Sequence, residues 1–156
     1  MMKVIPDYTG PMCRWPRMEL MPGVHETLSI LKGRYHLSLV TNAADSTESD
    51  IAEALEKGGL LDFIDSIYCF KKTGFKKPTP EYFRFVLGDL AVSADRAAMV
   101  GDDFRKDILG ANACGICGIW YNPFTEETRR SDLHDTIHSF AELPPLLSAR
   151  KVTSDK

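Results

Sequence analysis

The strongest constraint on the fold is the sequence Ala-Ala-Met-Val-Gly-Asp-Asp at residues 97–103. Its first four residues are apolar, which is typical of a short strand buried on both faces. Asp102 and Asp103 follow this strand, and Asp107 lies four residues further on in a helical pattern. Clustered carboxylates repel one another unless a cation lies among them, and oxygen-only ligands favour Mg²⁺ over Zn²⁺. The same residues also fit a plain strand-to-helix turn with an aspartate cap, so this stretch alone leaves both interpretations open.

Strands and helices are predicted to alternate along most of the chain, with short connections between them. This alternation predicts an α/β fold, a doubly wound parallel sheet of five strands with helices on both faces. Residues 12–21 are expected to be irregular, and a weak strand is expected before the last helix. The expected strands are residues 3–6, 36–40, 64–69, 97–100 and 116–121. The expected helices run from Val24 to a stop at Gly33, from a cap at Asp45 or Ser46 to Gly58, from Pro80 to about Leu87, and over 103–114 and 141–149.

Polar side chains follow three of the predicted strands. Asp7 comes after the first, Thr41 and Asn42 after the second, and Asp102 and Asp103 after the fourth. In doubly wound sheets, ligands bind at the carboxyl ends of the strands. The sequence therefore predicts an active site at this edge of the sheet.

These residue types suit phosphoryl transfer, which needs a nucleophile, a metal, a cation and neutral hydrogen-bond donors. Asp7 can be the nucleophile that forms an aspartyl phosphate. Asp102, with Asp103, can hold Mg²⁺ beside it. Thr41 offers a hydroxyl and backbone N–H groups at a turn into a helix, where phosphate commonly binds.

A lysine supplies the remaining cation. Lys77 lies in the polar loop before Pro80 and provides a compact positive charge for the phosphoryl oxygens. Asp107 can orient this lysine, because a carboxylate is the natural partner of an ammonium group.

Four short stretches carry the candidate residues, and their order along the chain is distinctive. They are Asp7-Tyr8-Thr9-Gly10, Leu39-Val40-Thr41-Asn42, Lys77-Pro78-Thr79-Pro80, and Val100-Gly101-Asp102-Asp103 with Asp107. This ordered set, over residues 3 to about 122, resembles the haloacid dehalogenase-like (HAD) superfamily of phosphohydrolases. In that superfamily an aspartate nucleophile and Mg²⁺ transfer phosphoryl groups. Met21-Pro22-Gly23-Val24 also resembles the segment before the first core helix of many members.

The resemblance implies a phosphoric monoester hydrolase with a Rossmann-like core and Mg²⁺ as its cofactor. It also implies a role for each matched residue. The implied catalytic residues are Asp7, Thr9, Thr41, Lys77 and Asp107. The implied phosphate-binding residues are Thr41, Asn42 and Lys77. The implied metal ligands are Asp7, Thr9 (through its backbone carbonyl), Asp102 and Asp103.

The first stretch departs from the family pattern at two positions. The superfamily usually carries a second aspartate two residues after the nucleophile, as general acid and then general base. Thr9 stands there instead, and Pro11 stands where a threonine is usual. A threonine hydroxyl does not ionise near neutral pH, and loss of a positioned acid/base costs about 10²–10⁴-fold in rate. We therefore expect slow turnover. A threonine at this position resembles the first motif of the ion-pumping ATPases of the superfamily, whose aspartyl phosphate is long-lived.

Two alternatives stay open. In another register Asp7 is the second aspartate and Ile5 stands where the nucleophile belongs, which removes covalent chemistry; the position of Gly10 favours the first register. The other alternative is a non-catalytic phosphate- and metal-binding module on the same scaffold, because the usual acid/base is missing.

The chain also departs from larger members of the superfamily in the length of two intervals. Residues 7–22 and 41–77 leave no room for a folded cap domain beyond the elements already assigned. The resemblance therefore implies a core without a cap, with a site open to water. Such a site suits a phosphorylated small molecule or macromolecule, or an oligomer in which a second subunit acts as a lid.

Length and composition set the remaining expectations. The 156 residues are 26% charged with net charge −3, and no basic cluster indicates a nucleic-acid surface. No apolar run has the length of a membrane span, and the N-terminus lacks the apolar core of a signal peptide. The four cysteines do not suggest a disulfide framework, so we expect a cytoplasmic protein. We expect one domain over residues 1–150 and a flexible tail at 151–156.

Overall fold

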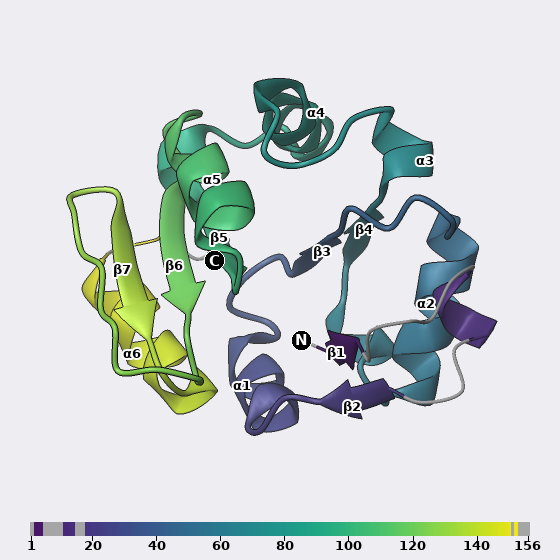
Figure 1. Ribbon diagram of the computed structural model, residues 1–156, viewed down its shortest axis with the longest axis horizontal. Helices are drawn as coiled ribbons and strands as arrows, with labels where there is room; N and C mark the ends of the chain where they lie inside the picture. Colours follow the sequence, from purple (N-terminus) through teal and green to yellow (C-terminus); the bar gives the residue numbers. More distant parts are fainter. Residues whose placement is uncertain (1, 5–10, 15–17, 151, 153–156) are drawn as a thin grey trace. The chain divides into compact units, whose positions relative to one another are not determined.

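The structure is a computed structural model that describes residues 2–4, 11–14, 18–150 and 152. The chain divides into two compact units, Met1–Gly74 with Ser154–Lys156, and Phe75–Thr153 (Figure 1). No helix among the described residues is both long enough and apolar enough to cross a membrane.

The first unit contains two ladders of short strands. β1 (Met2–Val4) pairs antiparallel with β2 (Met18–Leu20), and β3 (Ser38–Val40) pairs parallel with β4 (Ser66–Tyr68). The prediction that residues 12–21 are irregular is wrong at β2. Three residues are too few to show a period, so only the partner strand β1 defines this element.

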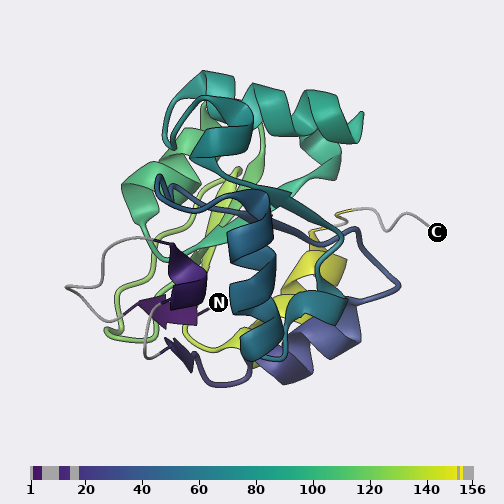
Figure 2. The ribbon, with the colours of Figure 1, turned by 90° about the vertical axis from the view of Figure 1, so that its right-hand side faces the viewer.

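Helices of the first unit pack beside these strands. They are α1 (Val24–Leu31), α2 (Glu48–Lys57) and α3 (Phe70–Thr73), with 3₁₀ turns at η1 (Met12–Arg14) and η2 (Leu61–Phe63). Figure 2 shows α2 lying across the β3–β4 ladder. The side chains buried between these elements are Val24, Leu31, Ile51, Ala54, Leu55, Ile67 and Tyr68.

The cap of α2 differs from the prediction. Thr47, not Asp45 or Ser46, is the N-cap: its hydroxyl accepts from Asp50 N at 3.1 Å, and the Asp50 carboxylate accepts from Thr47 N at 2.8 Å. This reciprocal capping box satisfies two backbone donors that a single Asp or Ser cap would leave open. These hydrogen bonds to Thr47 also lower the pKa of Asp50.

The second unit contains a parallel ladder in the order β5-β6-β7. Its strands are β5 (Ala98–Gly101), β6 (Cys117–Tyr121) and β7 (His134–Ile137). Figure 1 shows helical segments on both faces, with α5 in front of this ladder and α6 behind it. The weak strand expected before the last helix is confirmed as β7.

Helices connect and cover these strands. α4 (Pro80–Leu90) begins at the predicted proline and runs one turn beyond the predicted end. The helix predicted over 103–114 is a π-helical turn that passes into a short α-helix. The other elements are η3 (Ala94–Arg96), η4 (Phe104–Leu109, the π-helical turn), α5 (Gly110–Asn112), η5 (Phe140–Glu142) and α6 (Leu143–Ala149).

The predicted α/β class, with parallel strands and helices on both faces, is confirmed. The described strands form ladders of two, two and three strands within the two units. β1 pairs with the unpredicted β2, and β3 to β7 are all in parallel ladders.

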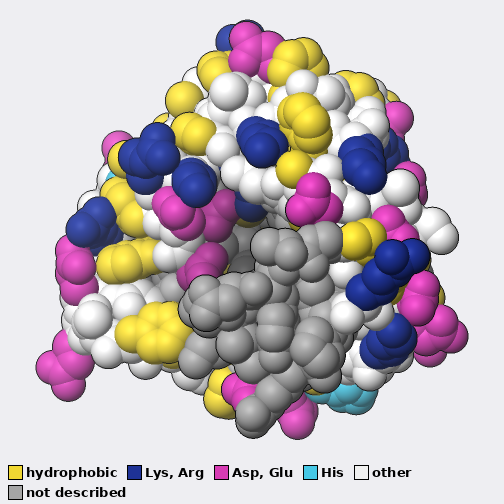
Figure 3. Space-filling model, turned by 45° about the vertical axis from the view of Figure 1, so that its right-hand side comes forward, with side chains coloured by type: hydrophobic (Ala, Val, Ile, Leu, Met, Phe, Trp, Pro, Cys, Tyr) yellow, Lys and Arg dark blue, Asp and Glu magenta, His cyan; other side chains and the backbone are white. Residues whose placement is uncertain are grey.

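On the face drawn in Figure 3, Lys and Arg side chains are interspersed with Asp and Glu rather than gathered by sign.

Candidate active site

The predicted carboxylates of the second unit lie at the carboxyl end of β5. Gly101 is the last residue of this strand, and the exposed Asp102 and Asp103 follow it directly. Asp103 is the N-cap of η4, since its side chain accepts a hydrogen bond from Lys106 N at 2.8 Å. The capping interpretation considered for this stretch therefore holds for Asp103, which still presents its carboxylate to solvent.

A buried ion pair supports this end of the strand. Lys77 Nζ donates to Asp107 Oδ1 at 2.7 Å, and the two side chains are only 10% and 6% exposed. The second oxygen of Asp107 accepts from Asp103 N at 3.1 Å. Lys77 therefore neutralises the charge of Asp107. Of the three clustered carboxylates, only Asp102 and Asp103 are left for a metal ion to neutralise.

Close packing brings Lys77 to this position. A Cβ at Gly110 would lie 2.8 Å from the Phe83 ring and 3.0 Å from Pro78 Cβ, so the absence of a side chain lets α5 approach the loop that carries Lys77. Real Cβ atoms essentially never show the 2.8 Å distance, because the two atoms would overlap. The Lys77–Pro78 peptide bond is cis.

Gly101 is required for the ion pair for a similar reason. A Cβ built at Gly101 would overlap the Asp107 carboxylate itself. We expect Gly101→Ala to displace Asp107 and to destabilise the protein by about 1–3 kcal/mol, the usual cost of overpacking. Urea denaturation measures this change. Gly88→Ala is the matched control, because nothing lies near its Cβ position and alanine favours the helix α4; equal stability of the two variants would contradict the prediction.

Of Asp102 and Asp103, Asp102 is the more available to a metal ion. Its side chain is exposed, and it makes no hydrogen bond or ion pair with any of the residues that the structure describes. Its backbone carbonyl, in contrast, accepts from the indole Nε1 of Trp120 at 2.9 Å. Nothing in the sequence pointed to this role of Trp120, because an aromatic residue near a strand end is usually part of the core.

The first unit carries the predicted phosphate-binding residues. Thr41 directly follows β3, and its backbone N–H donates to Tyr68 O at 3.0 Å. Its hydroxyl oxygen accepts from Ala43 N at 3.1 Å, so the chain turns immediately after the strand. Thr41 and Asn42 are both half-buried there. Their role in phosphate binding stays a prediction.

Asp7 and Thr9 lie outside the residues that the structure describes, and so their predicted roles stay predictions. Within the described ranges, no three His, Cys, Asp or Glu side chains are grouped to hold a metal ion. The predicted metal set includes Asp7 and Thr9 as well as Asp102 and Asp103, and only the last two are placed.

Known proteins share both sequence and fold with this chain. The ribulose-1,5-bisphosphate 5-phosphatase of Halopiger xanaduensis is 36% identical over 142 residues, which cover 84% of this chain and 58% of that protein. A crystal structure of an uncharacterized protein from Listeria monocytogenes serotype 4b matches with a TM-score of 0.79 and 29% identity, covering 90% of this chain and 86% of that one. The magnesium-bound HAD-hydrolase YfnB of Bacillus subtilis matches with a TM-score of 0.71 and 28% identity, covering 83% of this chain and 56% of that one.

The chain spans about half the length of the curated relatives it matches, 58% and 44% for two of them. Residues 2–120 match the family described as haloacid dehalogenase-like hydrolase, and this match includes all four stretches singled out in the sequence. The chain therefore belongs to the haloacid dehalogenase-like hydrolase family.

Proposed function

We propose that this protein is a Mg²⁺-dependent phosphatase that hydrolyses phosphoric monoesters through an aspartyl phosphate on Asp7. Family membership supports a hydrolase, and several relatives are named as phosphatases or nucleotidases. The observation that carries the proposal is the buried Lys77–Asp107 pair, because it fixes a cation behind the exposed carboxylates of Asp102 and Asp103. A purely structural turn needs no buried lysine at this place.

The proposed reaction has two displacements at phosphorus. A carboxylate oxygen of Asp7 attacks phosphorus, and the bond from phosphorus to the ester oxygen breaks. Water then attacks the aspartyl phosphate, releasing inorganic phosphate and restoring the Asp7 carboxylate. Thr41, Asn42 and Lys77 would hold the phosphoryl oxygens in both steps. With Thr9 in place of an ionisable side chain, the leaving oxygen takes its proton from water, and the reaction is slow.

The residues placed at the end of β5 fit Mg²⁺. Asp102 and Asp103 offer exposed carboxylate oxygens, which are the ligands this ion prefers. Together with Asp7 and the carbonyl of Thr9 they would form an oxygen-only donor set. When bound, Mg²⁺ would neutralise negative charge on the phosphoryl group.

The names of the relatives and the interval between Thr41 and Lys77 support a substrate class. Relatives named for ribulose-1,5-bisphosphate, glyceraldehyde 3-phosphate and phosphoserine favour a phosphorylated small molecule over a macromolecule. The interval between Thr41 and Lys77 is filled by α2, η2, β4 and α3, so it adds no cap to select the substrate. A cytoplasmic location and an oligomer with a shared site stay predictions.

Phosphate release tests this function. The protein should release phosphate slowly from an aryl phosphate such as p-nitrophenyl phosphate, lose this activity in EDTA and regain it with added Mg²⁺. Beryllofluoride, which mimics the phosphoryl group on an aspartate, should bind one to one in the presence of Mg²⁺. Release that is independent of the metal would contradict the proposal.

A non-catalytic module is the second candidate, favoured by Thr9 and Pro11 in the first stretch. In that case Mg²⁺ and phosphate would raise the melting temperature, because ligands that bind only the folded state stabilise it. No phosphate would be released under any condition. The same assays therefore separate the two candidates.

A further inference from the structure

The loop that carries Asp102 is tied to the neighbouring strand by a side chain. The register of the β5–β6 ladder pairs Gly101 with Trp120, and β5 ends there. The next carbonyl, that of Asp102, accepts from Trp120 Nε1 at 2.9 Å. A side-chain donor of β6 therefore satisfies the first carbonyl beyond the end of β5. Trp120 is only 9% exposed, which fixes its ring. Asp102 thus leaves the strand from a fixed backbone position.

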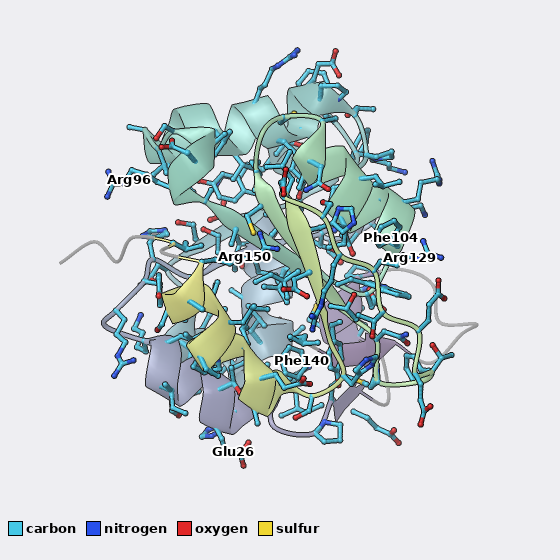
Figure 4. All side chains as sticks on the ribbon, turned by 90° about the vertical axis from the view of Figure 1, so that its left-hand side faces the viewer. Glu26, Arg96, Phe104, Arg129, Phe140 and Arg150 are labelled. Carbon is cyan, nitrogen blue, oxygen red and sulfur yellow. The ribbon has the colours of Figure 1, made fainter. Side chains whose placement is uncertain are left out.

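An aromatic and cationic layer covers this indole. The Phe104 ring lies edge-on to Trp120, with centroids 5.4 Å apart. The guanidinium carbon of Arg129 lies 4.3 Å from the Phe104 centroid and 5.0 Å from the Trp120 centroid. Figure 4 shows Arg129 beside Phe104 at the edge of the second unit. A cation over the faces of two rings is attracted to both of them, and Phe104 directly follows Asp103.

Hydrogen bonds to the backbone of Arg129 hold this residue near the two rings. The hydroxyl of Thr136, on β7, accepts from Arg129 N and donates to Arg129 O, both at 2.8 Å. Thr136 is only 6% exposed. Arg129 Nε also donates to Glu127 Oε1 at 2.7 Å.

The start of the same loop is equally ordered. Asn122 Oδ1 accepts from the backbone N–H groups of Phe124 and Thr125, and its amide donates to Glu127 O at 3.1 Å. One buried side chain thereby satisfies several groups of an irregular segment. The position of Arg129 over the rings is a consequence of this ordered loop.

We propose that Trp120 and Arg129 are positioning residues for the Mg²⁺ site. Trp120 fixes the backbone of Asp102, and Arg129 fixes Trp120 and Phe104. The inference depends on the proposed function, because it assigns Asp102 and Asp103 as ligands. Groups that orient metal ligands without touching the metal typically contribute 10–100-fold to metal affinity.

Trp120→Phe tests the tether, since it keeps a six-membered aromatic ring and removes the indole N–H together with the five-membered ring that carries it. We expect the dissociation constant for Mg²⁺, measured by calorimetric titration of the full chain, to rise about tenfold. The rate of phosphate release at saturating Mg²⁺ should stay within about twofold of wild type. A purely structural role would instead lower the melting temperature of the metal-free protein and leave the dissociation constant unchanged.

Arg129 gives a second, graded test. Arg129→Leu should weaken Mg²⁺ binding about threefold to tenfold, and Arg129→Lys should restore part of it, because a lysine also places a cation over the rings. Phe124→Ala is the control, since this side chain of the same loop is 69% exposed and should leave binding unchanged.

The outcomes separate the two proposals. Wild-type protein that binds no Mg²⁺ contradicts the proposed function. Wild-type protein that binds Mg²⁺ with the same affinity as Trp120→Phe and Arg129→Leu contradicts only the positioning role, and the proposed function stands.

Discussion

Asp7→Asn is expected to abolish Mg²⁺-dependent phosphate release, with a loss on the order of 10⁴-fold or more. An amide oxygen is a very poor nucleophile, so no aspartyl phosphate forms. The side chain keeps its size and can still accept a hydrogen bond, so the loss reports chemistry rather than packing. Initial rates of phosphate release at saturating substrate measure the effect.

Asp62→Asn is the matched control for this variant. Asp62 is an exposed aspartate of the same unit, and its replacement makes the same change in charge. It should leave the rate unchanged, and an equal loss in both variants would contradict a specific role for Asp7.

The size of the loss also separates the two registers of the first stretch. If Asp7 is the second aspartate and Ile5 holds the nucleophile position, Asp7→Asn costs only about 10²–10⁴-fold. In that register the wild-type protein cannot trap beryllofluoride, because no carboxylate is present at the nucleophile position. Trapping by wild type, lost in Asp7→Asn, therefore favours Asp7 as the nucleophile.

Elements with a strong local signal could be predicted from the sequence. Pro80 has no N–H to leave unsatisfied, and α4 begins there as expected. The apolar stretch before Gly101 is β5, and the carboxylates follow it directly. The pairing of Lys77 with Asp107 is also the one expected from their chemistry.

Features that depend on tertiary pairing could not be predicted. β2 is defined by its pairing with β1, which no local pattern shows. The π-helical turn η4 has no characteristic spacing of apolar residues that would distinguish it from an α-helix. The contact of Trp120 with Asp102 requires the register between β5 and β6. Arg129 lies in a loop whose course is set by Asn122 and Thr136, and no local pattern shows that it reaches two rings.

The buried ion pair makes the second large prediction. Lys77→Met leaves the Asp107 carboxylate buried without its cation, and Asp107→Asn leaves a buried ammonium without its anion. Breaking a buried pair from one side costs about 3–5 kcal/mol, because the remaining charge is uncompensated. Each single variant should therefore lose this amount of unfolding free energy in urea and should also lose phosphate release.

The double variant Lys77→Met with Asp107→Asn separates stability from function. Neither residue then carries a charge, so the double variant should be more stable than the sum of the two single losses predicts. It should nevertheless release no phosphate, because the cation that we propose for the phosphoryl oxygens is gone. Arg130→Met is the control: its ion pair with Asp135 is made by an arginine side chain that is 73% exposed, and its loss should cost less than about 1 kcal/mol. A double variant that regains stability and also keeps wild-type phosphate release would show that the pair serves only the fold, and Lys77 would then have no part in the reaction.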